Sequence, residues 1–311
     1  MLALGLSILA ATSSSSARNT GIPCARTSVN QTAFDVNALA TLHETSSDPP
    51  YFICLRPTEY VDKHLKKTGQ WPECSLLRSL LPPPPGLFVD AGANIGACSL
   101  FMAALGYRVI AFEPTPTTFA ALAAGVASNH QRHPPLDVRM VNAGLSNHSA
   151  RATIFSMPNN AGNSITTGSD QKPHSLKHVF SSHYRRHDIH LTTLDEMVHE
   201  PVGLMKIDTQ GHELRVLQGA SRLLGGREGI PVIKLEFYPP GMRAIGDEPV
   251  ELLHLLDAAG YNLEDVGGDQ VGHHAAVPVA RSDFQAFAQR VERKGYTDVV
   301  ARRKQPPRRQ L

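Results

Sequence analysis

The sequence predicts an α/β protein built on a doubly wound, mostly parallel sheet with helices on both faces. Two observations carry this prediction. Apolar runs of three to five residues alternate with longer helical patterns from residue 87 to about residue 260, an arrangement typical of parallel sheets. Four of the five runs lead directly into an acidic residue, and ligands of open α/β sheets bind where parallel strands end.

The overall composition narrows the class of protein. The 311 residues include 30 Lys and Arg against 28 Asp and Glu, a net charge of +2. This balance argues against a strongly basic nucleic-acid-binding protein and against an acidic disordered chain. We expect no transmembrane span, because no apolar run approaches the roughly 18–20 residues that a spanning helix needs.

The two ends of the chain differ from its middle. Leu2–Ala11 is apolar and is followed by a serine-rich stretch, so residues 1–17 are either a secretory signal without its usual positive start or a disordered segment. The secretory pathway and the cytoplasm therefore both remain open. Residues 301–311 are basic and contain Pro306-Pro307, which predicts a disordered tail.

Residues 18–81 are expected to form a polar lead-in that contains one helix. That helix should run from Thr58 to Lys67, with Thr58 as its N-cap. The proline run at 82–85 then acts as a stiff spacer. Cys98 lies in an apolar helical pattern, so we expect it to be a small buried residue. The three remaining cysteines then allow at most one disulfide and leave one free thiol.

The main body follows in a regular order. Strands are expected at Leu87–Val89, Arg108–Phe112, Val138–Val141, Leu204–Ile207 and Pro231–Leu235. Helices are expected at Ile95–Leu105, Pro116–Asn129, His212–Leu224 and Val250–Ala259. Proline in a first turn and glycine after a last turn mark several of these boundaries. Residues 156–188 are polar and poorly periodic, and we expect an insertion or lid there.

The four acidic residues at the strand ends are Asp90, Glu113, Asp208 and Glu236. Any one of them could be a turn or capping residue, but four on one sheet edge favour a binding site. After Asp90, Asn94 stands where a dinucleotide fingerprint would place its second glycine, which argues against NAD. No Tyr-x-x-x-Lys pair supports a dehydrogenase either. S-adenosylmethionine carries no phosphate and is compatible with this loop, while Glu113 can accept ribose hydroxyls.

Several segments, taken in order, resemble the FkbM-type methyltransferases. They are Asp90–Gly96, Ala111–Pro114, Asn142–Ser146, Leu194–Glu196 and Lys206–Ala220. The resemblance implies a class I methyltransferase fold, which is Rossmann-like, over residues 82–300. It also implies S-adenosylmethionine as the methyl donor and O-methylation of a hydroxyl on a sugar or small metabolite. Many members have Glu where this chain has Gln210.

The resemblance also implies roles for individual residues. The methionine end of the cofactor would lie against the loop after the first strand, the ribose against Glu113 and the adenine beside Asn142. The loop residues concerned are Asp90, Gly92, Asn94 and Gly96. Asp90 could bind the cofactor's ammonium group or organise the loop, and Asn142 could equally be a turn residue.

Methyl transfer to a hydroxyl requires positioning of that hydroxyl and removal of its proton. We expect Asp208 or His212 to be the base and Glu236 to help orient the acceptor. A divalent cation held by Asp208 and Glu236 is an alternative that we do not favour, and we assign no metal ligand. Paired histidines in the insertion, such as His183 and His187, have helical spacing for a metal, but the neighbouring arginines favour a variable lid instead.

Two functions remain after this reading. The first is an S-adenosylmethionine-dependent O-methyltransferase with a small-molecule or carbohydrate acceptor and no nucleic-acid partner. The second is a catalytically inactive module that kept the fold. Erosion of the cofactor loop would be typical of the second, and this loop is intact, so the enzyme is the favoured hypothesis. The sequence does not indicate an oligomeric state.

Overall fold

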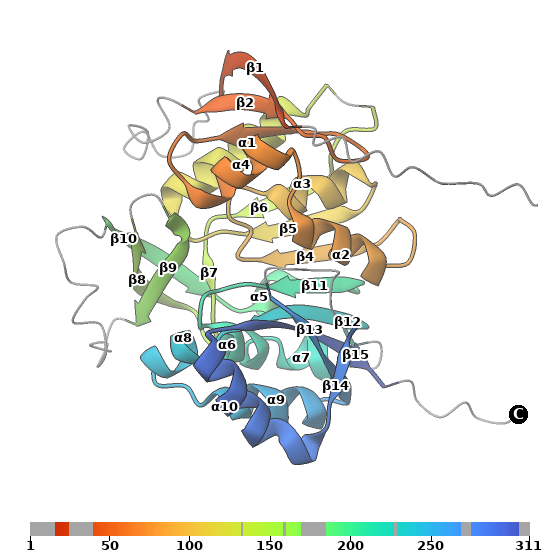
Figure 1. The fold of residues 1–311 in the computed structure, drawn as a ribbon, viewed down its shortest axis with the longest axis vertical. Coiled ribbons are helices and arrows are strands. Elements are labelled where there is room, and N and C mark those ends of the chain that lie inside the picture. The colour runs from red at the N-terminus through yellow and green to blue at the C-terminus, as the bar shows by residue number, and fades with distance from the viewer. Residues whose placement is uncertain are drawn as a thin grey trace, which may run out of the picture.

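The computed structural model describes residues 16–24, 40–131, 133–157, 160–168, 185–226, 229–268 and 275–304. Its centre is an eight-stranded sheet in the order β14-β13-β15-β12-β11-β4-β5-β6 (Figure 1). The parallel strands are β4 (Leu87–Ala91), β5 (Arg108–Phe112), β6 (Val138–Val141), β11 (Leu204–Ile207) and β12 (Val232–Phe237). The predicted doubly wound, mostly parallel sheet is therefore confirmed.

Two of the four acidic residues lie inside strands rather than after them. Asp90 pairs with Lys206 across β4 and β11, so a lysine neutralises a carboxylate in the middle of the sheet. Glu236 lies opposite Asp298 in the ladder between β12 and a neighbouring antiparallel strand. This ladder continues to Phe237, so β12 extends beyond its expected end. The sequence placed both residues at the ends of their strands, and each is the last residue but one of its strand.

Three antiparallel strands complete one edge of the sheet. They are β13 (Tyr261–Gly267), β14 (Val277–Val279) and β15 (Thr297–Arg303), and β15 is inserted between β12 and β13. Ala301–Arg303 thus end a strand, and this part of the expected disordered tail is ordered. The Arg303 guanidinium donates hydrogen bonds to the carbonyl oxygens of Leu224 and Gly226, which ties the strand to the neighbouring helix end.

Helices cover both faces of the central sheet (Figure 1). On one face are α1 (Tyr60–Thr68), α2 (Pro72–Leu80), α3 (Ala97–Ala104) and α4 (Pro116–Ser128). On the other are α6 (Glu213–Gln218), α7 (Ser221–Gly225), α8 (Pro239–Ala244), α9 (Pro249–Ala258) and α10 (Phe284–Lys294). Short α5 (Leu194–Met197) begins with a capping box formed by Thr193 and Glu196. Each face has its own apolar core, as a sheet covered on both sides requires.

The helix expected over residues 212–224 is broken into α6 and α7 at Gly219. A Cβ atom at Gly219 would lie 2.1 Å from the carbonyl oxygen of Ser146. The chain passes so close to its neighbour here that only glycine fits, and the helix ends at this contact.

The lead-in is a packed part of the fold. It contains an antiparallel sheet of β1 (Arg18–Pro23), β2 (Thr41–Glu44) and β3 (Phe52–Leu55), followed by α1 and α2. Apolar residues from β3, α1 and α2, such as Ile53, Leu65 and Leu77, are fully buried against α3 and α4. The N-cap position of α1 is Glu59 instead of Thr58.

All four cysteines form disulfides. Cys24 is bonded to Cys54 within the lead-in, and Cys74 of α2 is bonded to Cys98 of α3. The expectation of at most one bridge and a free thiol was wrong, because it set Cys98 aside as a simple core residue. The second bridge fixes the lead-in to the first helix of the main domain.

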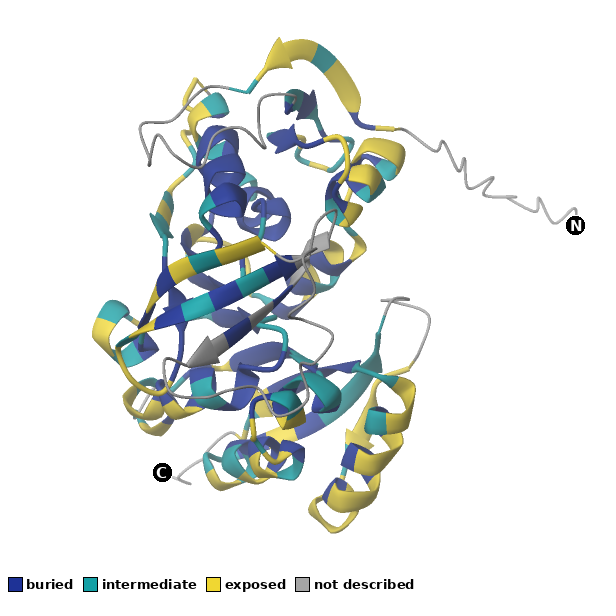
Figure 2. Ribbon diagram, turned by 90° about the vertical axis from the view of Figure 1, so that its left-hand side faces the viewer, coloured by how far each residue is buried: buried dark blue, intermediate teal, exposed yellow. Residues whose placement is uncertain are grey.

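A separate four-stranded sheet stands beside the central one, and we call it the lid sheet. Its strands are β7 (Gly144–Leu145), β8 (Ala150–Met157), β9 (Asn160–Gly168) and β10 (Arg185–Thr192), in the order β7-β10-β8-β9. Figure 2 looks onto this side of the molecule and shows exposed and buried residues alternating along its strands. Much of the insertion is therefore regular β-structure. His174, His178 and His183 lie outside the described residues.

Within the described residues, none of the helices is both long and apolar enough to cross a membrane.

Candidate functional site

A pocket lies where β4, β5 and β11 end, between the central sheet and the lid sheet. Four segments line it: the loop after β4, the end of β5, the turn after β11 and the inner face of the lid sheet. The lining residues are Gly92, Asn94, Phe112, Glu113, Pro114, Thr115, Ala143, Gly144, Leu145, Ile154, Ser164, Thr166, Leu191, Asp208, Thr209, Gln210 and His212. Five predicted site residues meet here, namely Gly92, Asn94, Glu113, Asp208 and His212.

The other four predicted residues, Asp90, Gly96, Asn142 and Glu236, do not line the pocket. Asp90 is 1% exposed, accepts a hydrogen bond from Ser99 Oγ at 2.6 Å and pairs with Lys206 Nζ at 3.2 Å. Lys206 also donates to the carbonyl oxygen of Gly92 at 3.2 Å. Of the two roles considered for Asp90, these contacts support organisation of the loop.

The loop after β4 depends on unusual backbone conformations. Gly92 has φ +84°, and a Cβ atom there would lie 1.8 Å from the carbonyl oxygen of Asp208. Asn94 has φ +52°, a left-handed conformation that asparagine tolerates better than most residues. Gly96 has φ +87° and packs under Leu122 of α4. These residues bring the loop against the end of β11.

Glu113 is the buried carboxylate of the pocket. Its Oε1 accepts the Thr115 N–H at 2.8 Å and its Oε2 accepts the Asn94 N–H at 3.0 Å. Burial raises the pKa of Glu113 to about 7, although these backbone hydrogen bonds favour the charged form. The Thr115 side chain also hydrogen-bonds to this carboxylate. Asn142 Nδ2 donates to the carbonyl oxygens of Glu113 and Pro114, so it fixes this strand end from behind.

Asp208 and Glu236 are bridged by an amide. Gln210 Nε2 donates to Asp208 Oδ1 at 2.7 Å and to Glu236 Oε2 at 2.8 Å. Burial raises the pKa of Glu236 well above its ordinary value, and the carboxylate of Asp208 raises it further. Gln210 occupies the space between the two carboxylates that a shared cation would need. Among the described residues there is no cluster of three His, Cys, Asp or Glu side chains suited to a metal ion.

His212 is 3% exposed and lies at the start of α6. Its Nε2 is 3.3 Å from the carbonyl oxygen of Thr166 in β9, so Nε2 carries the proton in this contact. Nδ1 has no hydrogen-bond partner among the described residues. Burial, together with the nearby charge of Arg215, lowers the pKa of His212 to about 4. The imidazole is therefore neutral, with a bare acceptor nitrogen.

The turn that carries His212 is held by Glu213. This buried carboxylate accepts hydrogen bonds from the N–H groups of Thr209 and Gly211 at 3.0 Å. Gly211 has φ +106°, and a Cβ atom there would lie 2.5 Å from the Gly241 carbonyl carbon. These contacts give Glu213 a structural role at the start of α6.

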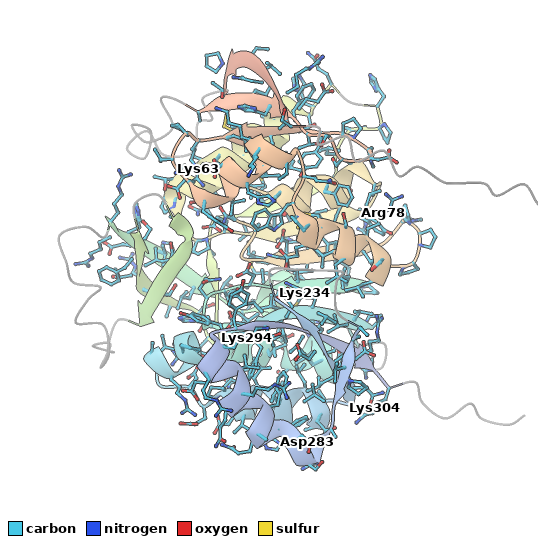
Figure 3. All side chains as sticks on the ribbon, viewed as in Figure 1. Lys63, Arg78, Lys234, Asp283, Lys294 and Lys304 are labelled. Atoms are coloured by element: carbon cyan, nitrogen blue, oxygen red, sulfur yellow. A yellow bond between two sulfur atoms is a disulfide. The ribbon has the colours of Figure 1, made fainter. Side chains whose placement is uncertain are left out.

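Sequence reasoning missed a buried ionic layer beneath the pocket. Lys234 of β12 pairs with Glu73 of α2 and with Asp298 of β15 at 2.9 Å, and Figure 3 shows it in the middle of the molecule. Lys206 pairs with Asp90 one strand over. Burial alone would lower the pKa of Lys206, but Asp90 and nearby carboxylates outweigh it and keep the lysine charged. The signal was available, because both lysines interrupt apolar strands.

The strand order, the loop after β4 and the acidic end of β5 define a class I methyltransferase fold. The family model described as the methyltransferase FkbM domain matches residues 90–263. The chain therefore belongs to the FkbM methyltransferase family, whose cofactor is S-adenosylmethionine, and the predicted resemblance is confirmed.

Two curated relatives are similar over part of the chain. Methyltransferase 1 of Beauveria bassiana (strain ARSEF 2860) is 29% identical over 152 residues, which are 44% of this chain and 59% of that protein. Methyltransferase sdnD of Sordaria araneosa is 27% identical over 168 residues, 45% of this chain and 61% of that protein. The matched region thus spans about three fifths of either relative.

Two solved structures are similar to this chain at low identity. The methyltransferase FkbM from Methylobacillus flagellatus KT has a TM-score of 0.41 and 14% identity, over 70% of this chain and 43% of that one. The magnesium protoporphyrin IX methyltransferase from Synechocystis PCC 6803, solved with bound S-adenosylmethionine, has a TM-score of 0.41 and 10% identity, over 80% and 86%.

Proposed function

We propose that the protein is an active S-adenosylmethionine-dependent O-methyltransferase that acts on a hydroxyl of a sugar or small metabolite. The observation that carries the proposal is His212. Its neutral imidazole is buried in the pocket wall, and its Nδ1 has no partner among the described residues. An unpaired buried nitrogen is costly, and a donor hydroxyl on a bound acceptor would satisfy it.

The charges of the pocket are compatible with the cofactor. S-adenosylmethionine carries a sulfonium and an ammonium group, and it presents two ribose hydroxyls. The pocket contains the carboxylates of Glu113 and Asp208, and no lysine or arginine lines its described part. Such a pocket favours a cationic ligand over a pyrophosphate. In this proposal the Gly92–Asn94 loop holds the methionine end and Glu113 holds the ribose.

The catalytic roles follow from the same contacts. When bound, S-adenosylmethionine supplies the methyl group on its sulfonium sulfur. Nδ1 of His212 accepts the proton of the acceptor hydroxyl as the new O–CH₃ bond forms and the S–CH₃ bond breaks. The Thr166 carbonyl keeps the Nε2 proton in place, so the ring presents Nδ1 as the basic atom. Asp208, which is partly exposed at the pocket edge and lies 3.7 Å from Lys206 Nζ, orients the acceptor hydroxyl. Glu236 does not contact the acceptor directly, and it helps to orient the acceptor by holding the Gln210 side chain.

The test is methyl transfer from tritiated S-adenosylmethionine to a panel of methyl glycosides and small alcohols. We expect transfer by the natural protein and a loss of kcat of about 10²–10³-fold in His212→Gln, with unchanged affinity for the cofactor. His199→Gln, at an exposed position, is the matched control and should stay fully active. Full activity of His212→Gln would exclude His212 as the base. Cofactor binding without transfer to any hydroxyl would favour the inactive module.

A further inference from the structure

We propose that His187 of the lid sheet is a second acceptor-contacting residue, which binds a hydroxyl of an uncharged, hydroxyl-rich acceptor opposite His212. This inference rests on the proposed function and names the acceptor class that the same pocket takes. It follows from the register of the lid sheet and from one unsatisfied nitrogen atom.

The register places His187 on the inner face of the lid sheet. His187 of β10 pairs directly with Ile154 of β8, and Ile154 pairs with Thr166 of β9. Paired residues of neighbouring strands point to the same side, with Cβ atoms about 5 Å apart. Ile154 and Thr166 both line the pocket. Leu191, four residues along β10 and therefore on the same side, lines it as well.

The His187 side chain is shielded but unsatisfied. Its Nε2 is buried and has no hydrogen-bond partner among the described residues. Burial lowers the pKa of His187, and Arg185 lowers it further, so the ring is neutral. Buried polar atoms of native proteins are nearly always hydrogen-bonded. A hydroxyl of the acceptor can act as donor or acceptor and would satisfy either tautomer of the ring.

The rest of this wall agrees with an uncharged acceptor. Near His187, the inner face carries the small hydroxyl side chains of Ser164 and Thr166, while Ile154 and Leu191 supply apolar surface. The described pocket lining contains neither His187 itself nor a lysine or arginine. On the same face of β10, two residues before His187, Arg185 is exposed to solvent. Hydroxyl groups beside apolar patches match the two kinds of surface on a neutral sugar or polyol.

The same strand offers a matched control. His190 also belongs to β10, but it is fully on the outer side, exposed and paired with Arg151 of β8. Replacing His187 and His190 removes the same side chain from opposite faces of one strand. A general effect on the lid sheet would appear in both variants, whereas loss of an acceptor contact would appear only in His187→Ala.

The experiment measures methyl transfer to methyl β-D-glucopyranoside, methyl α-L-rhamnopyranoside and glucose 6-phosphate. For the neutral glycoside that reacts, we expect His187→Ala to raise KM about tenfold with little change in kcat. His190→Ala should match the natural protein, and His187→Asn should recover part of the loss. Glucose 6-phosphate should be a poorer acceptor than the neutral glycosides. Affinity for S-adenosylmethionine, measured by calorimetry, should be equal in all variants.

The outcomes separate this inference from the proposed function. Transfer with the same KM in His187→Ala and His190→Ala would overturn the inference and leave the function in place. Preference for the phosphorylated sugar would overturn the assigned acceptor class. If neither the glycosides nor the small alcohols are methylated, the function fails, and calorimetry of methyl β-D-glucopyranoside on protein saturated with S-adenosylhomocysteine decides the binding site. Glycoside binding that is weakened only in His187→Ala supports the site, and absence of binding overturns it.

Discussion

At the scale of single residues, close backbone contacts explain the segment that is most specific to the family. Gly92, Gly211 and Gly219 each stand where a Cβ atom would meet backbone atoms of another segment at 2.5 Å or less. Gly92 and Gly211 also have positive φ angles. The glycines of the Asp90–Gly96 and Lys206–Ala220 segments therefore fix three chain crossings around the pocket, besides any contact with a ligand.

The titration of Glu113 predicts a pH dependence of cofactor binding. Burial raises its pKa to about 7 in the folded protein, from 4.5. Its contribution to folding stability is thus greatest below pH 4.5 and is lost as the pH rises through 7. Ribose binding has the opposite dependence, because the ionised carboxylate is the better acceptor. We expect calorimetry to show S-adenosylmethionine binding about tenfold weaker at pH 6 than at pH 8.

Glu113→Gln provides the control for this titration, because its amide does not ionise. The variant should bind the cofactor more weakly at pH 8, and its affinity should change little down to pH 6. An equally steep pH dependence in Glu113→Gln would assign the effect to another group, with Glu213 first, because burial also raises its pKa to about 7.

Single residues were also the part of the site that the sequence predicted best. Gly92, Asn94, Glu113, Asp208 and His212 do meet in one pocket, because a loop at the end of each parallel strand must open on the same edge. The sequence could not reveal that the Asp90 carboxylate is hydrogen-bonded to Ser99 and ion-paired with Lys206. The Lys206 contact joins positions 116 residues apart.

At the scale of elements, the sequence predicted the parallel strands and missed the antiparallel ones. Except for the edge strand β6, the parallel strands are largely buried on both faces, and they form short, mainly apolar runs in the sequence. The lid strands are half exposed and rich in polar residues, as the burial pattern of β10 shows. They resembled an irregular insertion for this reason. Part of strand β15 was taken for a tail, because its last residues are arginines.

The Cys74–Cys98 disulfide predicts an effect that extends to the pocket. It joins two helices, and in each helix the residue beside the cysteine contacts the ionic layer. Glu73, next to Cys74, pairs with Lys234, and Ser99, next to Cys98, donates a hydrogen bond to Asp90. For a sequence separation of 24, chain entropy gives about 3 kcal/mol of stabilisation. We expect the Cys74→Ala/Cys98→Ala double variant to melt several degrees lower and to bind S-adenosylmethionine more weakly.

The Cys24–Cys54 bridge is the matched control for this prediction. It closes a loop of similar length, with a sequence separation of 30, within the lead-in. Cys24→Ala/Cys54→Ala should lower the melting temperature by a similar amount and leave cofactor affinity unchanged. Equal cofactor affinity in both double variants, measured by calorimetry well below their melting temperatures, would show that the α2–α3 bridge does not support the pocket.

At the scale of the whole molecule, three units meet around one pocket. The central sheet supplies the cofactor loop and the acidic strand ends, the lid sheet supplies the opposite wall, and the lead-in supplies Glu73 to the buried ionic layer. Breaking one partner of a buried ion pair commonly costs about 3–5 kcal/mol. The lead-in is therefore part of the folded domain. Removing it would take Glu73 away from Lys234 and leave this buried lysine paired with Asp298 only.

We propose that the pocket where β4, β5 and β11 end is an S-adenosylmethionine site. The most direct test is isothermal titration of the protein from residue 18 onward with S-adenosylmethionine and with NAD, each with and without Mg²⁺. We expect S-adenosylmethionine to bind at one site per chain, with weaker binding in Glu113→Gln, and NAD not to bind. Failure of S-adenosylmethionine to bind a protein that circular dichroism shows to be folded would contradict the claim, and NAD binding in its place would assign the pocket to a different chemistry.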